Sequence, residues 1–194
     1  MTHKEVCEAL DISHRTLQRY RQKNIVPYSM IGRQIRYPRQ AVESLRERWM
    51  VETPAAAVMA DCFAQAVDFF SIGTNDLTQY LFAADRNNAK VAALNSYFQP
   101  ALLRMIDHIC RCAHENHIEV GICGQAGEAE ELIPLWMGMG VDELSVSIPS
   151  IPRVRRTIRR CDTGVCRRLA DRVLGLSSGD AVKQCVREEV EKWS

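Results

Sequence analysis

The sequence predicts an α/β protein in which a small, basic helical domain precedes a series of strand–helix units. After residue 50, short apolar stretches alternate with longer helical patterns, which is typical of parallel sheets. Residues 1–49 hold ten Lys/Arg and five Asp/Glu, a charge of +5, whereas the remainder holds fifteen and nineteen, a charge of −4. The 194 residues, 46% of them hydrophobic, suffice for two domains, which we place at residues 1–49 and 50–194.

The first domain begins with two short helices. Thr2 and Glu5 have the spacing of a capping box at the start of the first helix. Ser13 is the expected N-cap of the second helix, which runs from about His14 to Lys23 with Leu17 and Tyr20 facing inward. Two helices joined by a few residues, the second rich in Arg, Thr and Gln, form a helix-turn-helix pattern.

A hairpin and a third helix complete this domain in the sequence. Ile25–Tyr28 and Gln34–Tyr37 are the expected strands of the hairpin, with Gly32 between them. Pro38 then opens a helix that we expect to continue through Arg48. The order of elements predicts a small winged helix-turn-helix domain.

Three stretches of this domain, Thr2–Ser13, Arg15–Arg21 and Ile31–Tyr37, resemble the excisionase and MerR-like winged helix-turn-helix family. The resemblance implies that the second helix enters the major groove of DNA and that the wing touches the DNA backbone. The DNA-binding residues implied by position are Arg15, Thr16, Gln18, Arg19, Arg33 and Arg36. The alternative is a small helical domain with a solvated basic face.

The strand–helix units of the second domain can be placed along the chain. In order, we expect a strand ending at Glu52, a helix to about Ala66, a strand at Phe69–Ile72, a helix from about Leu77, a helix from Pro100 to about Asn116, a strand at Ile118–Ile122, a helix at Glu128–Met139, a strand at Val141–Val146, a turn and helix at Pro149–Arg160, and two helices over residues 162–194. Repeated units of this kind predict parallel pairing with right-handed crossovers.

The stretch Asp68–Tyr80 is the most informative segment of the chain. An apolar strand runs into a Gly-Thr-Asn-Asp turn, and a helical pattern follows. This places the amide of Asn75 and the carboxylate of Asp76 at the carboxyl end of a parallel strand, where α/β folds keep their chemistry.

Five stretches of the second domain together resemble the phosphoenolpyruvate-binding barrel of Enzyme I, the phosphoenolpyruvate-protein phosphotransferase of the sugar phosphotransferase system. The stretches are Val51–Ala57, Asp68–Tyr80, Ala84–Asn87, Val120–Gly124 and Gly140–Ser147. The resemblance implies a partial (β/α)8 barrel, a TIM barrel of which only the last strands are present. It also implies binding of Mg²⁺ and phosphoenolpyruvate.

The resemblance also assigns roles by matched position. Glu52 and Asp76 would hold the Mg²⁺, as a hard cation prefers oxygen ligands. Asn75 and Arg86 would bind the substrate, and Cys123 would be the catalytic acid that protonates the enolate. Taken singly, the same residues have structural alternatives: Glu52 beside a helix dipole, Asn75 and Asp76 as caps of the helix at Leu77, Arg86 as a solvated charge, and Cys123 as a buried small hydrophobe.

Several features depart from the family pattern. No histidine lies in a phosphoacceptor motif, and the five are His3, His14, His108, His114 and His117. Three or four parallel strands cannot close a barrel, so a partner is needed, and we expect a homodimer. We therefore expect a phosphotransferase-like protein without autonomous activity. The alternative is a DNA-binding transcriptional regulator or excisionase-like protein whose second domain serves dimerisation or ligand sensing.

Composition adds three expectations. The start of the chain has no apolar signal region and no stretch is long enough to span a membrane, so we expect a cytoplasmic protein without membrane contact. The eight cysteines are irregularly spaced, which favours reduced thiols. Cys110 with Cys112, and Cys161 with Cys166, lack a zinc spacing, so the sequence predicts no structural metal.

Overall fold

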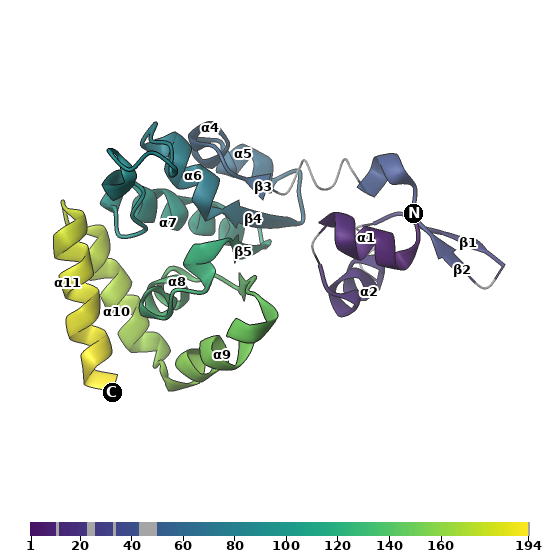
Figure 1. Cartoon of the computed structure of the whole chain (residues 1–194). Helices are drawn as coiled ribbons and strands as arrows, with labels where there is room; N and C mark the ends of the chain where they lie inside the picture. Colours follow the sequence, from purple (N-terminus) through teal and green to yellow (C-terminus); the bar gives the residue numbers. More distant parts are fainter. Residues whose placement is uncertain (11, 23–25, 33, 43–49, 194) are drawn as a thin grey trace. The chain divides into compact units, whose positions relative to one another are not determined.

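The structure is a computed structural model that describes residues 1–10, 12–22, 26–32, 34–42 and 50–193 (Figure 1). The chain divides into two compact units, Met1–Met50 and Val51–Ser194, which we describe separately. Among the described residues, no helix has both the length and the apolar character needed to cross a membrane. All eight cysteines are described, and none is in a disulfide.

In the first unit, helices α1 (His3–Leu10) and α2 (His14–Gln22) begin at the predicted caps. The capping box is reciprocal: the Thr2 amide donates to the Glu5 carboxylate at 2.7 Å, and the Glu5 amide donates to the Thr2 hydroxyl at 3.2 Å. The Ser13 hydroxyl likewise accepts from the amide of Thr16 at 3.0 Å. The core of the unit comprises Val6, Cys7, Leu17, Tyr20, Val26, Tyr37 and Val42. The inward side of α2 is therefore as predicted.

The hairpin of the first unit has a different first strand from the predicted one. Strands β1 (Ser29–Ile31) and β2 (Gln34–Arg36) pair antiparallel, with Ile31 opposite Gln34. Residues 26–28, the described part of the predicted strand Ile25–Tyr28, are not in a strand, so that prediction was wrong there, and residue 25 lies outside the described residues. Residues 39–42 are helical, and the rest of the predicted third helix lies outside the described residues.

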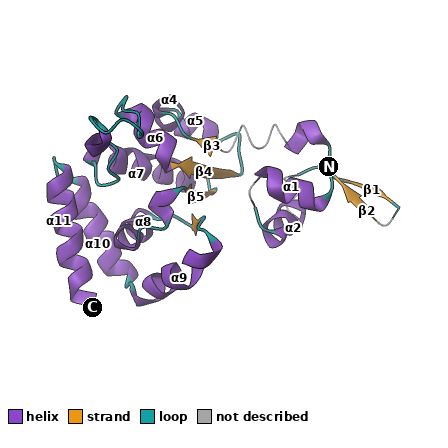
Figure 2. Cartoon of the chain, in the orientation of Figure 1, coloured by secondary structure: helices purple, strands orange, loops and turns teal. Residues whose placement is uncertain are grey.

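The second unit is built on a four-stranded sheet in the order β3 (Met50–Val51), β4 (Phe69–Gly73), β5 (Glu119–Cys123), β6 (Glu143–Leu144) (Figure 2). Strands β4 and β5 pair in parallel over five residues, from Phe69 with Glu119 to Gly73 with Cys123. Strand β6 pairs in parallel with β5 through only two residues, so the predicted strand Val141–Val146 is shorter than expected. The last residues of β4 and β5, Gly73 and Cys123, therefore lie side by side.

The helices of the second unit are α4 (Pro54–Val58), α5 (Ala60–Ala64), α6 (Thr74–Leu81), α7 (Pro100–Glu115), α8 (Ile133–Met139), α9 (Ile151–Arg160), α10 (Thr163–Leu174) and α11 (Gly179–Val190). The predicted helix after the first strand is two helices, because the backbone leaves α-geometry at Met59. The predicted helix Glu128–Met139 begins only at Ile133, after short 3-10 turns at Gln125–Gly127 and Glu130–Leu132. The two helices of the tail are as predicted, and Ser178 caps the second.

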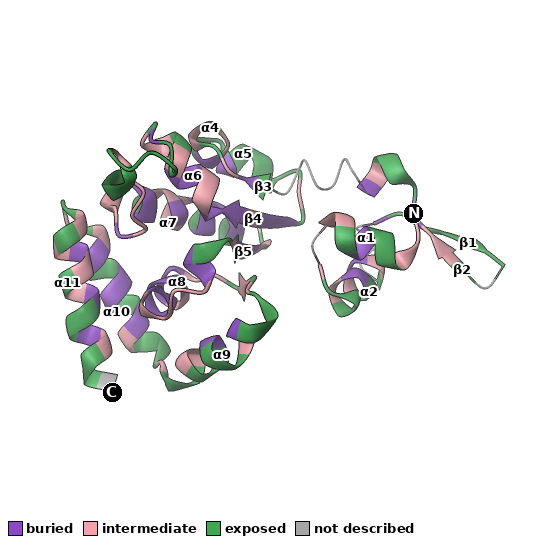
Figure 3. Ribbon diagram, viewed as in Figure 1, coloured by how far each residue is buried: buried purple, intermediate pink, exposed green. Residues whose placement is uncertain are grey.

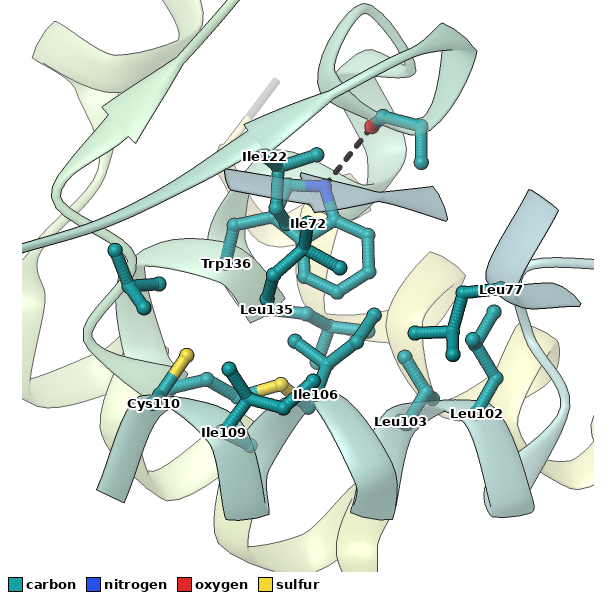
Figure 4. Packing of buried hydrophobic residues seen from close by; sticks show 14 of the residues in the cluster. Ile72, Leu77, Leu102, Leu103, Ile106, Ile109, Cys110, Ile122, Leu135 and Trp136 are labelled. Carbon is teal, nitrogen blue, oxygen red and sulfur yellow. Dashed lines mark hydrogen bonds between the residues drawn. The ribbon is translucent and has the colours of Figure 1, made fainter. Parts of the chain in front are cut away.

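One side of the sheet and helix α7 form the core of the second unit (Figures 3 and 4). Ile72 of β4 and Ile122 of β5 are fully buried and point toward the apolar face of α7, which includes Ile106 and Ile109. The buried Trp136 of α8 fills the space beside them, and its indole N–H donates to the carbonyl of Ala126 at 2.9 Å. This close packing fixes the positions of β4 and β5. It therefore also fixes the residues that follow these two strands at their carboxyl ends.

Candidate active site

The first turn of helix α6 carries two of the predicted site residues. The helix begins at Thr74, directly after β4, rather than at Leu77. Asn75 and Asp76 are therefore inside its first turn, and they are not the caps that one alternative assumed. The N-cap position is Gly73, which has no side chain to cap with. A carboxylate in the first turn of a helix is favoured by the helix dipole.

Glu52 lies against the end of the neighbouring strand. A Cβ atom built on Gly73 would come within 2.6 Å of Glu52 Cγ and 2.7 Å of its carboxylate oxygen Oε1. Glycine at position 73 therefore makes room for the Glu52 side chain. The structure thus brings Glu52 to Gly73, the last residue of β4. Gly73 itself precedes Asp76 by three residues in the chain.

Cys123 is the last residue of β5 and lies opposite Gly73 in the sheet. Its side chain is half-buried, so it is not the fully buried hydrophobe of the alternative interpretation, and its thiol donates to the carbonyl of Ile72 at 3.4 Å. The buried Thr74 hydroxyl donates to the carbonyl of Cys123 at 3.1 Å and ties the start of α6 to the end of β5. The carboxyl ends of the two strands are thereby held together.

Gly124 allows Asn75 to approach this strand end closely. Its φ angle of 102° lies in a region that suits glycine, and a Cβ there would be 3.2 Å from Asn75 Oδ1. The Tyr97 hydroxyl donates to the same Oδ1 atom and lies 3.5 Å from Gln125 Oε1. Burial raises the pKa of Tyr97, and the charge of Arg86 partly opposes this rise. The hydroxyl is therefore a protonated donor at neutral pH, and it turns the Asn75 amide so that its NH₂ group faces away from Tyr97.

Arg86 lies near the Asp76 end of the site. Its guanidinium Nη1 is 3.9 Å from Asp76 Oδ1, and the two side chains are 51% and 41% exposed. An ion pair between side chains as exposed as these contributes at most about 1 kcal/mol to the stability of the fold. Tyr97, which sequence reasoning had missed, therefore contacts Asn75 and lies close enough to Arg86 for that charge to act on its hydroxyl. Tyr97 lies 22 residues from Asn75 in a loop, so no local pattern identified it.

The residues predicted to bind DNA are on the first unit. Arg15 and Gln18 are exposed on α2, whereas Thr16 and Arg19 are half-exposed. Thr16 contacts the Ser13 hydroxyl, and the Arg19 guanidinium lies 5.8 Å from the centre of the Tyr20 ring. On the hairpin, Arg36 donates to the Gln34 side chain at 2.6 Å. The sixth predicted residue, Arg33, lies outside the described residues.

Glu128 joins the segments that follow β5 and β6. Its carboxylate accepts from the amide of Ser147 at 2.5 Å and from the hydroxyl of Ser150 at 2.8 Å. These hydrogen bonds, led by the backbone amide, lower the pKa of Glu128. Because the pKa of Glu128 is lower in the folded state, its ionised carboxylate stabilises the fold at pH values above the ordinary carboxyl pKa of about 4.3. This stabilisation is lost as the pH falls through the lower folded-state pKa.

We expect Glu128→Gln to lower the thermal midpoint at pH 7. Its effect should shrink progressively as the pH falls from the ordinary carboxyl pKa of about 4.3 through the lower folded-state pKa, where the wild-type carboxylate also becomes protonated. Thermal melts of both proteins between pH 3 and 7 measure this. Glu188→Gln, which changes an exposed glutamate of α11, is the control. A difference between wild type and Glu128→Gln that stayed constant across this range would show that the charge of Glu128 does not stabilise the fold.

Comparisons with known protein families give two matches along the chain. Residues 27–163 match the family described as PEP-utilising enzyme, PEP-binding domain. Residues 1–50 match a helix-turn-helix domain family. The two matches overlap over residues 27–50, which the structure assigns to the first unit.

Curated relatives match between 62% and 89% of the chain. The chain is 51% identical over 125 residues to a phosphoenolpyruvate-protein phosphotransferase of Haloferax volcanii, covering 64% of this chain and 22% of the relative. It is 48% identical over 121 residues to multiphosphoryl transfer protein 1 of Escherichia coli K12, covering 62% and 15%. It is 39% identical over 172 residues to a phosphoenolpyruvate-protein phosphotransferase of Geobacillus stearothermophilus, covering 89% and 30%. The chain thus spans less than a third of the length of these relatives.

Proposed function

Since the chain belongs to the PEP-utilising enzyme family through its PEP-binding domain, we propose that residues 51–194 bind Mg²⁺ and phosphoenolpyruvate at the carboxyl edge of the sheet. The observation that carries this proposal is the placement of Glu52, Asn75, Asp76 and Cys123 at or just after the ends of β3, β4 and β5. Ligands of open α/β sheets bind outside this edge.

Glu52 and Asp76 suit a Mg²⁺ ion, because both offer carboxylate oxygens, the ligands that a hard cation prefers. The contact of Glu52 with the bare backbone of Gly73 supports this assignment, since any larger residue at position 73 would displace the carboxylate. When bound, Mg²⁺ would neutralise the negative charge of the substrate carboxylate and phosphate.

Asn75 and Arg86 are the proposed substrate contacts. The Asn75 amide is oriented by Tyr97, so its NH₂ group can donate to an anionic oxygen of the substrate. The guanidinium of Arg86 offers paired N–H donors that suit phosphate oxygens, and its loose pairing with Asp76 leaves it able to turn toward a ligand.

Cys123 is the proposed acid. When the phosphoryl group leaves phosphoenolpyruvate, the P–O bond breaks and an enolate remains. A proton from the Cys123 thiol would add to the methylene carbon of that enolate, yielding pyruvate and a thiolate. The thiol is half-buried at the edge of the sheet and is held through its contact with the carbonyl of Ile72.

Phosphoryl transfer also needs an acceptor, and we propose that this chain by itself binds the ligand without autonomous transfer. We further propose that the strands form part of a (β/α)8 barrel and that the unit self-associates. Support comes from the open sheet and from exposed apolar side chains on α4 and α5: Val58 is 62% exposed and Phe63 is 44% exposed. Sedimentation of the purified chain tests self-association, and a monomer at all concentrations would exclude it.

Calorimetric titration of the purified chain with phosphoenolpyruvate, with and without Mg²⁺, tests the binding proposal. We expect saturable binding that requires Mg²⁺. A folded protein that shows no binding under either condition would contradict the proposal, and the second unit would then have a purely structural role.

DNA binding by the first unit is the second candidate function. The helix-turn-helix match over residues 1–50 and the excess of basic residues there both favour it. In this proposal, exposed α2 residues such as Arg15 and Gln18 enter the major groove, and Arg36 of the hairpin contacts the DNA backbone.

We expect Arg19→Ala to cost about 1–3 kcal/mol of specific DNA binding, because an arginine that reads a base edge contributes that much discrimination. Selection from a random DNA pool, followed by titration of the selected sequence, measures it. Arg155→Ala removes an equal charge from exposed α9 and is the matched control. Equal affinities for both variants would exclude Arg19 from base recognition.

A further inference from the structure

Three potential metal ligands converge in the first unit. His3 and Cys7 lie four residues apart on one face of α1, and His14 is the first residue of α2. One ligand atom from each of the three lies within 4.8 Å of the other two. Among the described residues, this is the one group of three or more His, Cys, Asp or Glu side chains with such spacing.

The distances within this cluster suit a small divalent cation. Cys7 Sγ and His14 Nδ1 are 3.7 Å apart. A tetrahedral zinc ion with bonds of about 2.3 Å to sulfur and about 2.0 Å to nitrogen places two such atoms about 3.5 Å apart. The rings of His3 and His14 lie parallel with their centres 5.0 Å apart, so a turn of one ring about its Cβ–Cγ bond would point both lone pairs to one ion.

Tyr37 is a hydrogen-bond partner of His3. Its hydroxyl lies 3.1 Å from His3 Nδ1, and the tyrosine side chain is buried. When Nδ1 donates its proton to this hydroxyl, the lone pair on Nε2 is left for a metal. Histidine ligands usually have an outer partner of this kind, which sets the tautomer and the ring orientation. His14 is exposed, so solvent reaches the cluster.

We propose that His3, Cys7 and His14 bind a Zn²⁺-class divalent cation, with water in the fourth coordination position. Thiolate and imidazole are the ligands that favour such borderline-soft ions over Mg²⁺. The bound ion would link α1 to α2 and brace the helix-turn-helix. Sequence reasoning missed this site because it looked for paired cysteines. The usable signal was His and Cys at positions i and i+4 of one helix.

The chain contains a matched control for this proposal. On α7, Cys112 Sγ lies 3.7 Å from the ring nitrogens of His108, the same sulfur-to-nitrogen separation as in the cluster. In the part of the chain that the structure describes, no third ligand completes this pair. Cys112 is also buried like Cys7, so changes at the two cysteines remove comparable side chains.

The experiment is a zinc titration of the full chain against a competing chromogenic chelator, with cobalt as a spectroscopic probe. We expect one tight site per chain and a thiolate-to-cobalt absorption band. Both should be lost in Cys7→Ala and His14→Gln, with at least about 100-fold weaker binding, whereas Cys112→Ala should bind as the wild type does. Tyr37→Phe should weaken zinc binding about 10-fold while leaving the metal-free melting temperature nearly unchanged.

Two results would overturn the proposal. One is a folded wild-type chain whose zinc affinity does not exceed that of His14→Gln. The other is a cobalt band that depends on Cys112 rather than on Cys7. Because His14 is exposed, His14→Gln is expected to fold even if Cys7→Ala does not, so the test does not depend on the buried cysteine. Phosphoenolpyruvate binding by the second unit is measured separately and does not affect the result.

Discussion

Gly138→Ala should destabilise the second unit by about 3 kcal/mol, the upper end of the usual cost of overpacking. Helix α8 crosses α10 so closely at this glycine that an added Cβ would lie 2.2 Å from the carbonyl oxygen of Cys166 and 2.7 Å from its carbonyl carbon. These are backbone atoms of α10, so no rotamer change relieves the clash. The two helices would have to move apart, and the packing of Trp136 beside them would loosen.

Urea unfolding followed by circular dichroism measures this loss, with Gly179→Ala as the control. A Cβ at Gly179, the first residue of α11, would have its nearest neighbour at 3.5 Å, an ordinary contact. Gly179→Ala should leave the free energy of unfolding unchanged or raise it by about 0.4–1 kcal/mol. The reason is that an unfolded chain with alanine at this position has fewer conformations than one with glycine, so folding loses less entropy. A loss below about 0.5 kcal/mol for Gly138→Ala would mean that the two helices separate at little cost.

Asp76→Asn should reduce Mg²⁺-dependent binding of phosphoenolpyruvate by at least about 100-fold, the upper end of the loss caused by changes around a bound metal. The substitution keeps the shape of the side chain and removes its charge. The fold should be unaffected, since Asp76 is 41% exposed and its one described ion pair, with Arg86, is 3.9 Å long. Any loss of binding can then be attributed to the site.

Calorimetry of wild type and variant under the same Mg²⁺ concentration tests this expectation. Asp85→Asn is the matched control, because it removes an exposed carboxylate from the residue next to Arg86. It should bind as the wild type does. If Asp76→Asn retained Mg²⁺-dependent binding, Asp76 would not be a metal ligand, and Glu52 would need a different partner.

Local sequence signals predicted much of the fold. The Thr2–Glu5 capping box and the Ser13 cap are formed as expected, because each depends only on residues three positions apart. The inward side of α2 and the two helices of the tail follow from apolar periodicity, which burial enforces. The strand at Phe69–Gly73 is apolar enough on both faces to be recognised as a buried parallel strand.

Element boundaries were less predictable. Helix α6 begins at Thr74, and the Thr74 hydroxyl donates to the carbonyl of Cys123, 49 residues away in the chain. The hairpin strand at Ser29–Ile31 is set by its pairing with β2 rather than by its own composition. In both places the deciding partner lies on another element, which no sequence window contains.

The sequence by itself determined the α/β class, the two-part organisation and the residues proposed for the site, through residue type and family pattern. Only the tertiary structure decided which residues meet. It placed Glu52 on the bare backbone of Gly73, joined Tyr97 to Asn75, and gathered His3, Cys7 and His14. Caps and periodicity depend on neighbours within a few positions, whereas a site depends on atoms brought together by chain packing, and that packing is a property of the whole core.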